Sequence, residues 1–590
     1  MSPSPDIPDT SLHGVVTFDI LSDNTLVDPG YEVISITLVN EVNRIPTATI
    51  LVRDGNAADE TFEISNTADF APGKAIQINL GRDGDNEPAF KGIVTRHCIK
   101  VSENGQSNLL VECRDESVKL TVGRHSRYFE DKKDQEVIEE IVATYGLTTD
   151  VEDTSLVHKE LVQHHTTDWD FVLSRADVNG KLTIVEDGKI TIQAPKTEED
   201  AEISLHYGQN LLEFEAGMDA RDQWNSVKGI AWDYANQRLF EADTESADFQ
   251  EHGNINGEDL ADAINLAEFE LRHSGYLLEE ELQQWVDSGM LRSRLAKIRG
   301  RAKVRDGYLG FKPGKMVNLE GVGERFEGKA FITGVRHEAR SGAWDTHIQF
   351  GLDPKWFACS ENIMDIPAAG LLPGVRGLQI GKVVQLQNDP AGEDRIRVKI
   401  PVVDNQSAGI WCRVACLDAG ENRGTFFRPE IDDEVIVGFI NDDPRDAIVV
   451  GMLNSSAKPA PLTAQDANDE KGVFTRSSMR IHFNDNTKTI TIDTPAGNSI
   501  TLDEAGQSIE IKDQNQNNIK MGTSGIEMTS PQEVKIQAGT SLTLAAGTTL
   551  SIGGVSVSAK ADAAMSLEGA TSKLSASGIT EITGSLVKIN

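Results

Sequence analysis

Several clusters of polar residues have types and spacings that could support chemistry. The run Glu279-Glu280-Glu281 offers neighbouring carboxylates, which could serve as a general acid and base. The chain carries 93 acidic residues and this run lies in a helical context, so a solvated helix face explains it better. No Ser-His-Asp arrangement, phosphate-binding loop or dinucleotide-binding motif is visible. We therefore predict no catalytic residues.

The candidate metal ligands are isolated from one another. His164 and His165 have no Cys or His nearby at ligand spacing. The segment 83–87 hints at a calcium loop but lacks the full pattern, and a hairpin turn explains its Gly and Asn. Cys412 and Cys416 lack a second Cys/His pair, and we interpret them as two buried thiols on one face of a strand. We predict no metal site and no cofactor.

A basic stretch stands out in an otherwise acidic chain. Its members are Arg292, Arg294, Lys297, Arg299, Arg301, Lys303 and Arg305. Such clustering is compatible with a nucleic-acid patch. The alternative that we favour is a surface facing another subunit or a tube, paired with acidic neighbours.

Length and composition restrict the class of protein. At roughly 100–200 residues per domain, 590 residues predict three to five domains. The formal charge of −37 argues against a protein that wraps nucleic acid or adheres to anionic membrane, since both need surplus Lys and Arg. No segment approaches the 18 apolar residues of a spanning helix, and the first residues do not resemble a secretory signal. We expect synthesis in the cytoplasm.

The elements expected in the first 365 residues are strands with a few helices. Apolar alternation over 34–38 predicts a half-buried strand, and helical spacing over 137–145 predicts a helix. A second helical region is expected over 258–293. Gly275 and Gly289 are the positions at which it would break.

An internal repeat links two distant parts of this region. Residues 70–80 and 311–319 share a Pro-Gly-Lys turn followed by an alternating strand. Each is followed by a second similar strand, at 90–97 and 326–337, that ends in Arg-His. The repeat predicts two related β-barrel domains, and a trimer would then present six similar barrels in a ring.

The last region is an array of short strands. Apolar pairs recur every nine or ten residues up to about 521 and every seven or eight from about 526. One chain cannot bury this apolar row, whereas three chains wound together could, as a needle on the order of 60 Å long at about 4.8 Å per strand. The predicted core residues of the needle are Ile490, Ile492, Ile500, Leu502, Ile509, Ile511, Val534, Ile536, Leu542, Leu544, Leu550 and Ile552.

Four blocks of the middle region, 394–401, 409–415, 424–439 and 441–451, carry a more specific pattern. They resemble the OB-fold signature of VgrG-type spike proteins, in which Arg-Val-Lys and Trp-x-Arg-Val strands precede a hairpin and an Asn-Asp-Asp-Pro turn. Asp432 stands where that pattern usually has glycine. The matching residues are Arg397, Val398, Trp411, Arg413, Pro429, Asp433, Glu434, Asn441 and Pro444.

The resemblance also extends to the hub, where Asp168-Trp-Asp-Phe171 is similar to a hub-domain motif of the same family. It implies a mainly β fold with a few helices: a hub with two related β-barrel domains, an OB-fold and a triple-stranded β-helix needle in a homotrimer. The expected domains are a tail-hub-like region, the OB-fold, a linker and the needle. Their expected ranges are 1–365, 370–455, 456–480 and 481–590.

The function implied by the resemblance is mechanical. The chain would be the hub and spike of a phage-tail-like contractile injection system, of the type VI, extracellular-particle or prophage kind. It would dock on the inner tube ring and baseplate proteins, and it would pierce the target envelope when the sheath contracts. The implied partners are a PAAR-like tip protein and effector cargo, with only transient contact with the target membrane and no nucleic acid.

Two alternatives come from other functional classes. An enzyme would need a murein- or glycan-cleaving carboxylate pair in a cleft of the hub. A receptor-binding tailspike would need an aromatic-rich glycan surface along the rod. Phe483 is the only Phe, Tyr or Trp after residue 480 in the sequence, which argues against that second alternative.

Overall fold

A computed structural model of the chain describes residues 14–103, 105–247, 249–266, 268–304, 306–359 and 363–589. Its contacts divide the chain into two compact units. One contains Met1–Arg428 with Ile436–Val450, and the other contains Pro429–Val435 with Gly451–Asn590. Among the described helices, none combines the length and the apolar character needed to span a membrane.

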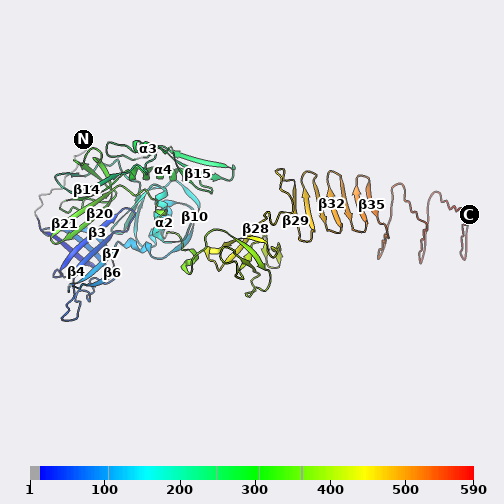
Figure 1. Cartoon of the computed structure of the whole chain (residues 1–590), viewed down its shortest axis with the longest axis horizontal. Coiled ribbons are helices and arrows are strands. Elements are labelled where there is room, and N and C mark those ends of the chain that lie inside the picture. Colours follow the sequence, from blue (N-terminus) through cyan, green and yellow to red (C-terminus); the bar gives the residue numbers. More distant parts are fainter. Residues whose placement is uncertain are drawn as a thin grey trace. The chain divides into compact units, whose positions relative to one another are not determined.

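The first unit holds a large sheet, several small sheets and the helices (Figure 1). The large sheet contains β1 (Val16–Ser22), β2 (Thr25–Leu26), β3 (Val33–Glu41), β4 (Thr47–Arg53), β5 (Ala75–Arg82), β6 (Asp85–Val101), β7 (Ser107–Arg114), β13 (Ile203–His206), β14 (Leu211–Met218), β18 (Ile298–Val304), β19 (Met316–Glu320), β20 (Gly328–Arg340) and β21 (Ala343–Phe350). The small sheets contain β8 (His125–Lys133) and β10 (Val157–Thr166); β9 (Thr148–Val151), β11 (Leu182–Glu186) and β12 (Lys189–Gln193); and β15 (Val227–Asp233), β16 (Arg238–Thr244) and β17 (Phe269–Arg272). The described α-helices are α1 (Asp134–Ala143), α2 (Asp168–Val178), α3 (Gly257–Ile264) and α4 (Glu279–Ala296).

The large sheet is built from two lobes. The first lobe runs β3-β4-β7-β6-β5-β1-β2, and the second runs β14-β18-β21-β20 with β19 and β13 branching from β20. The lobes join where β3 pairs antiparallel with β20, in the register Glu41 to Gly334 through Ser35 to Arg340. The predicted strand over 34–38 is therefore confirmed as part of β3, at the junction of the lobes.

The Pro-Gly-Lys turns make the same hydrogen bonds in both lobes. Gly73 N donates to the Val94 carbonyl oxygen at 2.8 Å, and Gly314 N donates to that of Ile332 at the same distance. In return, the Val94 and Ile332 amides donate to the carbonyl oxygens of the lysines that follow the two glycines, each at 2.9 Å. This matched geometry supports an internal duplication.

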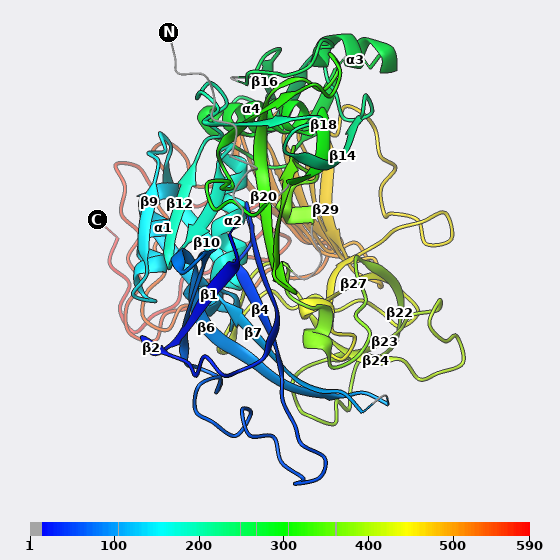
Figure 2. The same ribbon diagram turned by 90° about the vertical axis from the view of Figure 1, so that its left-hand side faces the viewer.

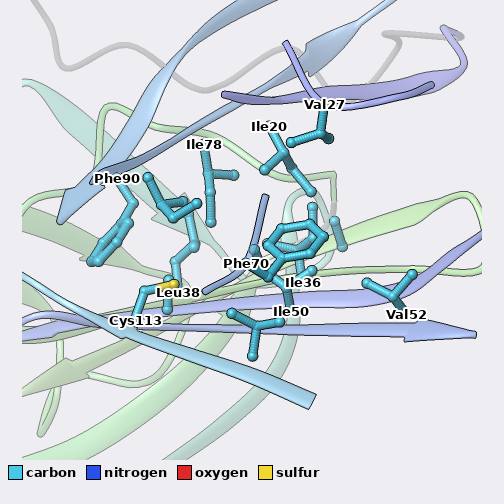
Figure 3. Close-up of a cluster of buried hydrophobic side chains, with 14 of the residues drawn as sticks. Ile20, Val27, Ile36, Leu38, Ile50, Val52, Phe70, Ile78, Phe90 and Cys113 are labelled. Atoms are coloured by element: carbon cyan, nitrogen blue, oxygen red, sulfur yellow. The ribbon is translucent and has the colours of Figure 1, made fainter. Parts of the chain in front are cut away.

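Each lobe has its own apolar core. In the first lobe Phe70, Ile36 and Ile78 are at most 2% exposed, and Figure 3 shows their side chains pointing toward one another. In the second lobe Phe311 and Phe350 occupy comparable buried positions. Phe70 and Phe311 precede the two related turns, so the repeat in the sequence marks a repeat in packing.

A helical layer accompanies the sheet. In Figure 2, α1 lies beside β9 and β12, and its apolar face packs with α2 in one buried cluster. The predicted helix over 137–145 corresponds to α1, although α1 ends at Ala143. Gly146 follows with φ +70°, a left-handed conformation that glycine adopts without strain.

The second predicted helical region is only partly helical. Residues 257–264 form α3, but Phe269–Arg272 form β17, which pairs in parallel with β15. The chain breaks near Gly275, as expected, whereas Gly289 lies inside α4. A Cβ added at Gly289 would lie only 3.3 Å from the Leu271 side chain. The glycine therefore allows close packing against Leu271 and does not break the helix. Ala267, which belongs to the same prediction, lies outside the described residues.

The middle region forms a closed five-stranded barrel, β22-β23-β24-β28-β27. Its strands and a small hairpin are β22 (Gln379–Gln385), β23 (Ile396–Lys399), β24 (Ile410–Val414), β25 (Ala419–Gly420), β26 (Arg423–Gly424), β27 (Glu434–Phe439) and β28 (Ala447–Met452). Cys412 is buried in β24, and burial raises the pKa of its thiol to about 12. The prediction of a second buried thiol is wrong: β24 ends at Val414, and Cys416 is exposed beyond it.

The backbone conformation at Asp432 is one that favours glycine, the usual residue of the family pattern at this position. Its φ is +71°, a region that costs most side chains roughly 1–2 kcal/mol. We expect Asp432→Val to accelerate hydrogen exchange of the β27 amides about 5- to 30-fold, the factor that corresponds to this cost. Asp432→Gly is the matched control and should leave exchange unchanged or slower. Equal exchange in the two variants would contradict the argument.

The second unit contains a seven-stranded antiparallel ladder in which each strand pairs with the next (Figure 1). Its strands are β29 (Glu470–Phe474), β30 (Arg480–Asn484), β31 (Thr489–Asp493), β32 (Ser499–Asp503), β33 (Ser508–Lys512), β34 (Asn518–Gly522) and β35 (Gly525–Thr529). The segment 456–480 is expected to be a linker, but residues 470–474 of it form β29. This strand belongs to the ladder because it pairs with β30 over its whole length.

Candidate functional site: the apolar face of the ladder

The register of the ladder collects its apolar residues on one face. Ile492 pairs with Ile500, and Ile500 pairs with Ile511, so these side chains form a column across three strands. A second column contains Leu502 and Ile509, which face each other across β32 and β33. Directly paired residues point to the same side of a sheet, so both columns lie on one face.

The opposite face is polar. Thr501 pairs with Thr491 on one side and with Glu510 on the other, and Lys520 continues the row between Glu510 and Glu527. The apolar face is the more exposed of the two around β32, where Ile500 and Leu502 are exposed and Thr501 is only partly exposed. A continuous exposed apolar face of this kind indicates an interaction surface.

The predicted needle core lies on this surface and its continuation. Ile490 is partly exposed, and the other eleven predicted core residues are at least 39% exposed in the single chain. Fully burying an exposed side chain of this size contributes roughly 1.5–3 kcal/mol. Covering these partly exposed side chains would contribute a fraction of that each, summed along the row. That these residues form a trimer core remains a prediction.

The pairing pattern changes where the repeat spacing changes. Up to Thr529 the chain pairs with itself in the ladder, and within 530–589 the structure contains no strand paired in the same chain. The apolar pairs nevertheless continue there, with Ile536 at 62% and Ile552 at 70% exposed. Backbone groups of such alternating segments need partners, and strands of other chains could supply them.

The residues of the predicted OB-fold signature lie on the barrel and its turns. Arg397 on β23 faces Trp411 on β24, and its guanidinium lies 5.7 Å from the ring centroid. Asn441 adopts φ +50° in the turn before Pro444, a conformation that Asn tolerates well. These contacts lie within the barrel and its turns.

The basic stretch pairs with acids of its own chain. Arg301 bonds Glu215 at 2.5 Å, and Lys303 bonds Asp345 at 3.0 Å. Lys297 is 1% exposed and lies 2.7 Å from a Glu251 carboxylate oxygen. The remaining described ion pairs are Arg292 with Asp177, Arg294 with Glu251 and Arg299 with Asp353.

The cations of the basic stretch are neutralised within the chain. The six described cations have acidic partners in their own chain, and a surface facing another subunit or a tube, or a nucleic-acid patch, stays a prediction. Sequence reasoning missed these partners because they lie up to 115 residues away from the cations they neutralise, as Lys297 with Glu251 and Arg292 with Asp177 illustrate. Arg305 lies outside the described residues.

The polar clusters of the sequence also have structural partners. His165 Nδ1 lies 2.9 Å from an Asp365 carboxylate oxygen. Residues 83–84 form the turn between β5 and β6, with φ +51° and +91°. Glu279–Glu281 form the first turn of α4. In the part of the chain that the structure describes, no three His, Cys, Asp or Glu side chains are grouped to hold a metal ion.

Ser65 and His97 form a hydrogen-bonded pair of the kind that a nucleophile and its general base make. His97 Nδ1 lies 3.0 Å from the Phe70 carbonyl oxygen, so Nδ1 carries the proton and Nε2 accepts from Ser65 Oγ at 2.6 Å. An acyl-transfer site also needs free backbone donors for an oxyanion. The amides of Ser65, Asn66 and Thr67 are already bonded within the loop. The pair therefore ties the β4–β5 loop to β6.

Asp168 begins α2 and anchors it to the strands around it. Its carboxylate is fully buried and accepts hydrogen bonds from Arg127 at 3.0 Å, Tyr145 at 2.7 Å and Gln163 at 2.7 Å. Burial and the bond to Asp168 raise the pKa of Tyr145 to about 12. The hub motif thus has a structural role in seating α2.

Comparison with known proteins gives matches over both the hub and the barrel. The Alg8 N-terminal domain family matches residues 12–341, which is more than half of the chain. The type VI secretion system/phage-baseplate injector OB domain matches residues 379–453.

Curated relatives match about two thirds of this chain. The type VI secretion system spike protein VgrG1b of Pseudomonas aeruginosa is 22% identical over 436 residues, which is 69% of this chain and 57% of that protein. VgrG1a of the same organism is 21% identical over 440 residues, 69% of this chain and 66% of that protein. The chain thus spans about three fifths of the length of these relatives. A solved 43 kDa tail protein of prophage MuSo2 from Shewanella oneidensis aligns with 57% of this chain and 98% of its own, at 12% identity and a TM-score of 0.43.

Proposed function

We propose that this chain, which belongs to the Alg8 N-terminal domain family and to the VgrG-type spike proteins, is the structural spike of a contractile injection system. The observation that carries the proposal is the apolar face of the ladder, which runs from β30 to β35 and continues as alternating apolar pairs to the end of the described chain. A repeated strand pattern of this kind builds a rod rather than a pocket.

The assembly is a homotrimer in this proposal. Three ladders with their apolar faces inward would form a three-sided prism, and the segment after Thr529 would obtain its backbone partners from the two other chains. Closure in this way leaves no open sheet edge and buries the apolar row along one axis. Rigidity follows from interchain hydrogen bonds around a continuous apolar core.

The hub would dock on the inner tube ring and the baseplate. Two related lobes per chain give six similar units in a trimer, which suits a sixfold partner. Sheath contraction would then drive the needle into the target envelope, with a PAAR-like protein at the tip and effectors as cargo. The chain would be made in the cytoplasm and act as part of an assembled particle there or outside the cell.

The position of the chain in a particle tests this function directly. Sheathed particles from the producing cells can be labelled with an antibody against the barrel region, for example against the exposed loop around Phe426. We expect label at one end of extended particles, and its loss from contracted sheaths. Label distributed along the sheath, or absent from intact particles, would contradict a spike.

A further inference from the structure

The connection between the hub and the barrel is a single stretch of chain, residues 351–378. It begins after β21, the last strand of the large sheet, and ends at β22, the first strand of the barrel. Any covalent transmission of force from the hub to the needle passes through this connector. Its attachments to the hub therefore determine whether it can carry force.

A buried ion pair holds the start of the connector. Arg292 on α4 and Asp177 on α2 are 7% and 4% exposed and form an ion pair with each other. Arg292 Nη1 donates to the Lys355 carbonyl oxygen at 2.7 Å, and its guanidinium lies 4.8 Å from the Trp356 ring centroid. Burial lowers the pKa of Arg292 to about 10, which still leaves it charged at neutral pH.

Asp177 holds the next residue of the connector. Its Oδ2 accepts a hydrogen bond from the Phe357 amide at 2.9 Å. The Asp177 carbonyl oxygen in turn accepts from Ser288 Oγ at 2.6 Å, which ties α2 to α4. Each of the two charged groups thus makes a hydrogen bond to the connector backbone, and both helices that carry them are part of the hub (Figure 1).

Further attachments follow along the connector. The Ile363 carbonyl oxygen accepts from Thr166 Oγ1 at 3.3 Å and from Arg124 Nη1 at 3.4 Å, and Asp365 pairs with His165. These contacts are longer or more exposed than those of Asp177 and Arg292. The ion pair is the attachment that is buried, charged and directed at the backbone, so it should resist pulling most strongly.

We propose that Asp177 and Arg292 form a clamp that fixes the connector to the hub. Axial force then reaches the needle without first extending the connector. The inference rests on the proposed spike function for the origin of the force. The clamp itself is a property of the isolated protein. Releasing residues 352–366 would lengthen the connection by up to about 50 Å, at roughly 3.3–3.6 Å per residue.

Single-molecule pulling on the purified full-length protein tests the clamp, with one handle in the hub and one at the needle. We expect the wild type to show a release step of up to about 50 Å. In Asp177→Asn and in Trp356→Ala that step should shift to a clearly lower force. Trp356→Ala removes the ring that packs on the Arg292 guanidinium, keeps both backbone hydrogen bonds and leaves no buried charge unpaired, so it guards against a folding defect in Asp177→Asn.

Arg299→Ala is the matched control. It removes a 3.7 Å contact with Asp353 on the same connector, but both side chains are well exposed, so the release force should stay at the wild-type value. Hydrogen exchange of the 352–359 amides should rise about tenfold or more in the two clamp variants only. An unchanged release force or unchanged exchange in both clamp variants would overturn the clamp. Failure of particle labelling would instead overturn the spike function and leave the pulling result standing.

Discussion

Replacing Ile500 with aspartate is expected to prevent assembly of the trimer while the hub stays folded. Ile500 lies on the exposed apolar face between Ile492 and Ile511. In the assembled needle, three aspartates would face one another along the axis, where an unpaired charge costs several kcal/mol or more per chain. The expected result is a species of single-chain mass that retains the hub's hydrogen-exchange protection.

The matched control is the next residue, Thr501, on the polar face of the same strand. Thr501→Asp adds the same charge beside Glu510 and Thr491, and it should leave the trimer intact. The same comparison applies beyond the ladder, where Ile536→Asp should disrupt the needle and Lys535→Asp should not. Trimers of full heat and detergent resistance in the two isoleucine variants would contradict the assigned face.

The second large effect is expected at a buried carboxylate in the hub. Asp134 begins α1 and is fully buried, with Arg175 Nε at 2.6 Å and His158 Nε2 at 3.1 Å. Asn179 donates a further hydrogen bond at 2.8 Å. Removing the carboxylate in Asp134→Ala leaves Arg175 without its main buried partner, a loss of about 3–5 kcal/mol. Hydrogen exchange of the α1 and α2 amides should reveal it.

The same site predicts a dependence on pH. Burial opposes the ionised form of Asp134, but the hydrogen bonds from His158 and Arg175 outweigh it and hold the pKa of this carboxyl well below its usual range. A lowered folded-state pKa contributes stability above the unfolded value of about 4, and this contribution is lost as the pH falls. The wild type and Asp134→Ala should therefore differ most near neutral pH and converge in acid.

An exposed carboxylate provides the control for both measurements. Asp153 pairs with Lys133 at 2.8 Å, but its side chain is 73% exposed. Asp153→Ala should therefore exchange like the wild type at neutral pH and in acid. An equal effect of Asp153→Ala and Asp134→Ala would show that local charge, rather than the buried network, stabilises this layer.

Local periodicity made some elements predictable from sequence. The strand β3 and the helix α1 have apolar residues at the spacing of their final geometry, and the ladder repeats one short pattern in every strand. The two Pro-Gly-Lys turns could be matched because the same short sequence forms the same turn twice in one chain. In each case the signal lies within about ten neighbouring residues.

Features that depend on distant partners could not be predicted in this way. β17 is apolar at helical spacing yet forms a strand, because β15 offers a parallel edge about 40 residues earlier in the chain. Cys416 alternates correctly with Cys412, but the strand ends before it. Neither the clamp at Asp177 nor the network at Asp134 has a local signature, since their members come from separate elements.

Two further copies of this chain are expected to cover the apolar face, and the solution mass tests this assembly most directly. Light scattering on a size-exclusion column should give a species near 3 × 64.3 = 193 kDa that resists mild denaturant. A stable species of 64.3 kDa, with the residues of the apolar face protected from exchange, would contradict the account, because the repeat would then close on itself within one chain.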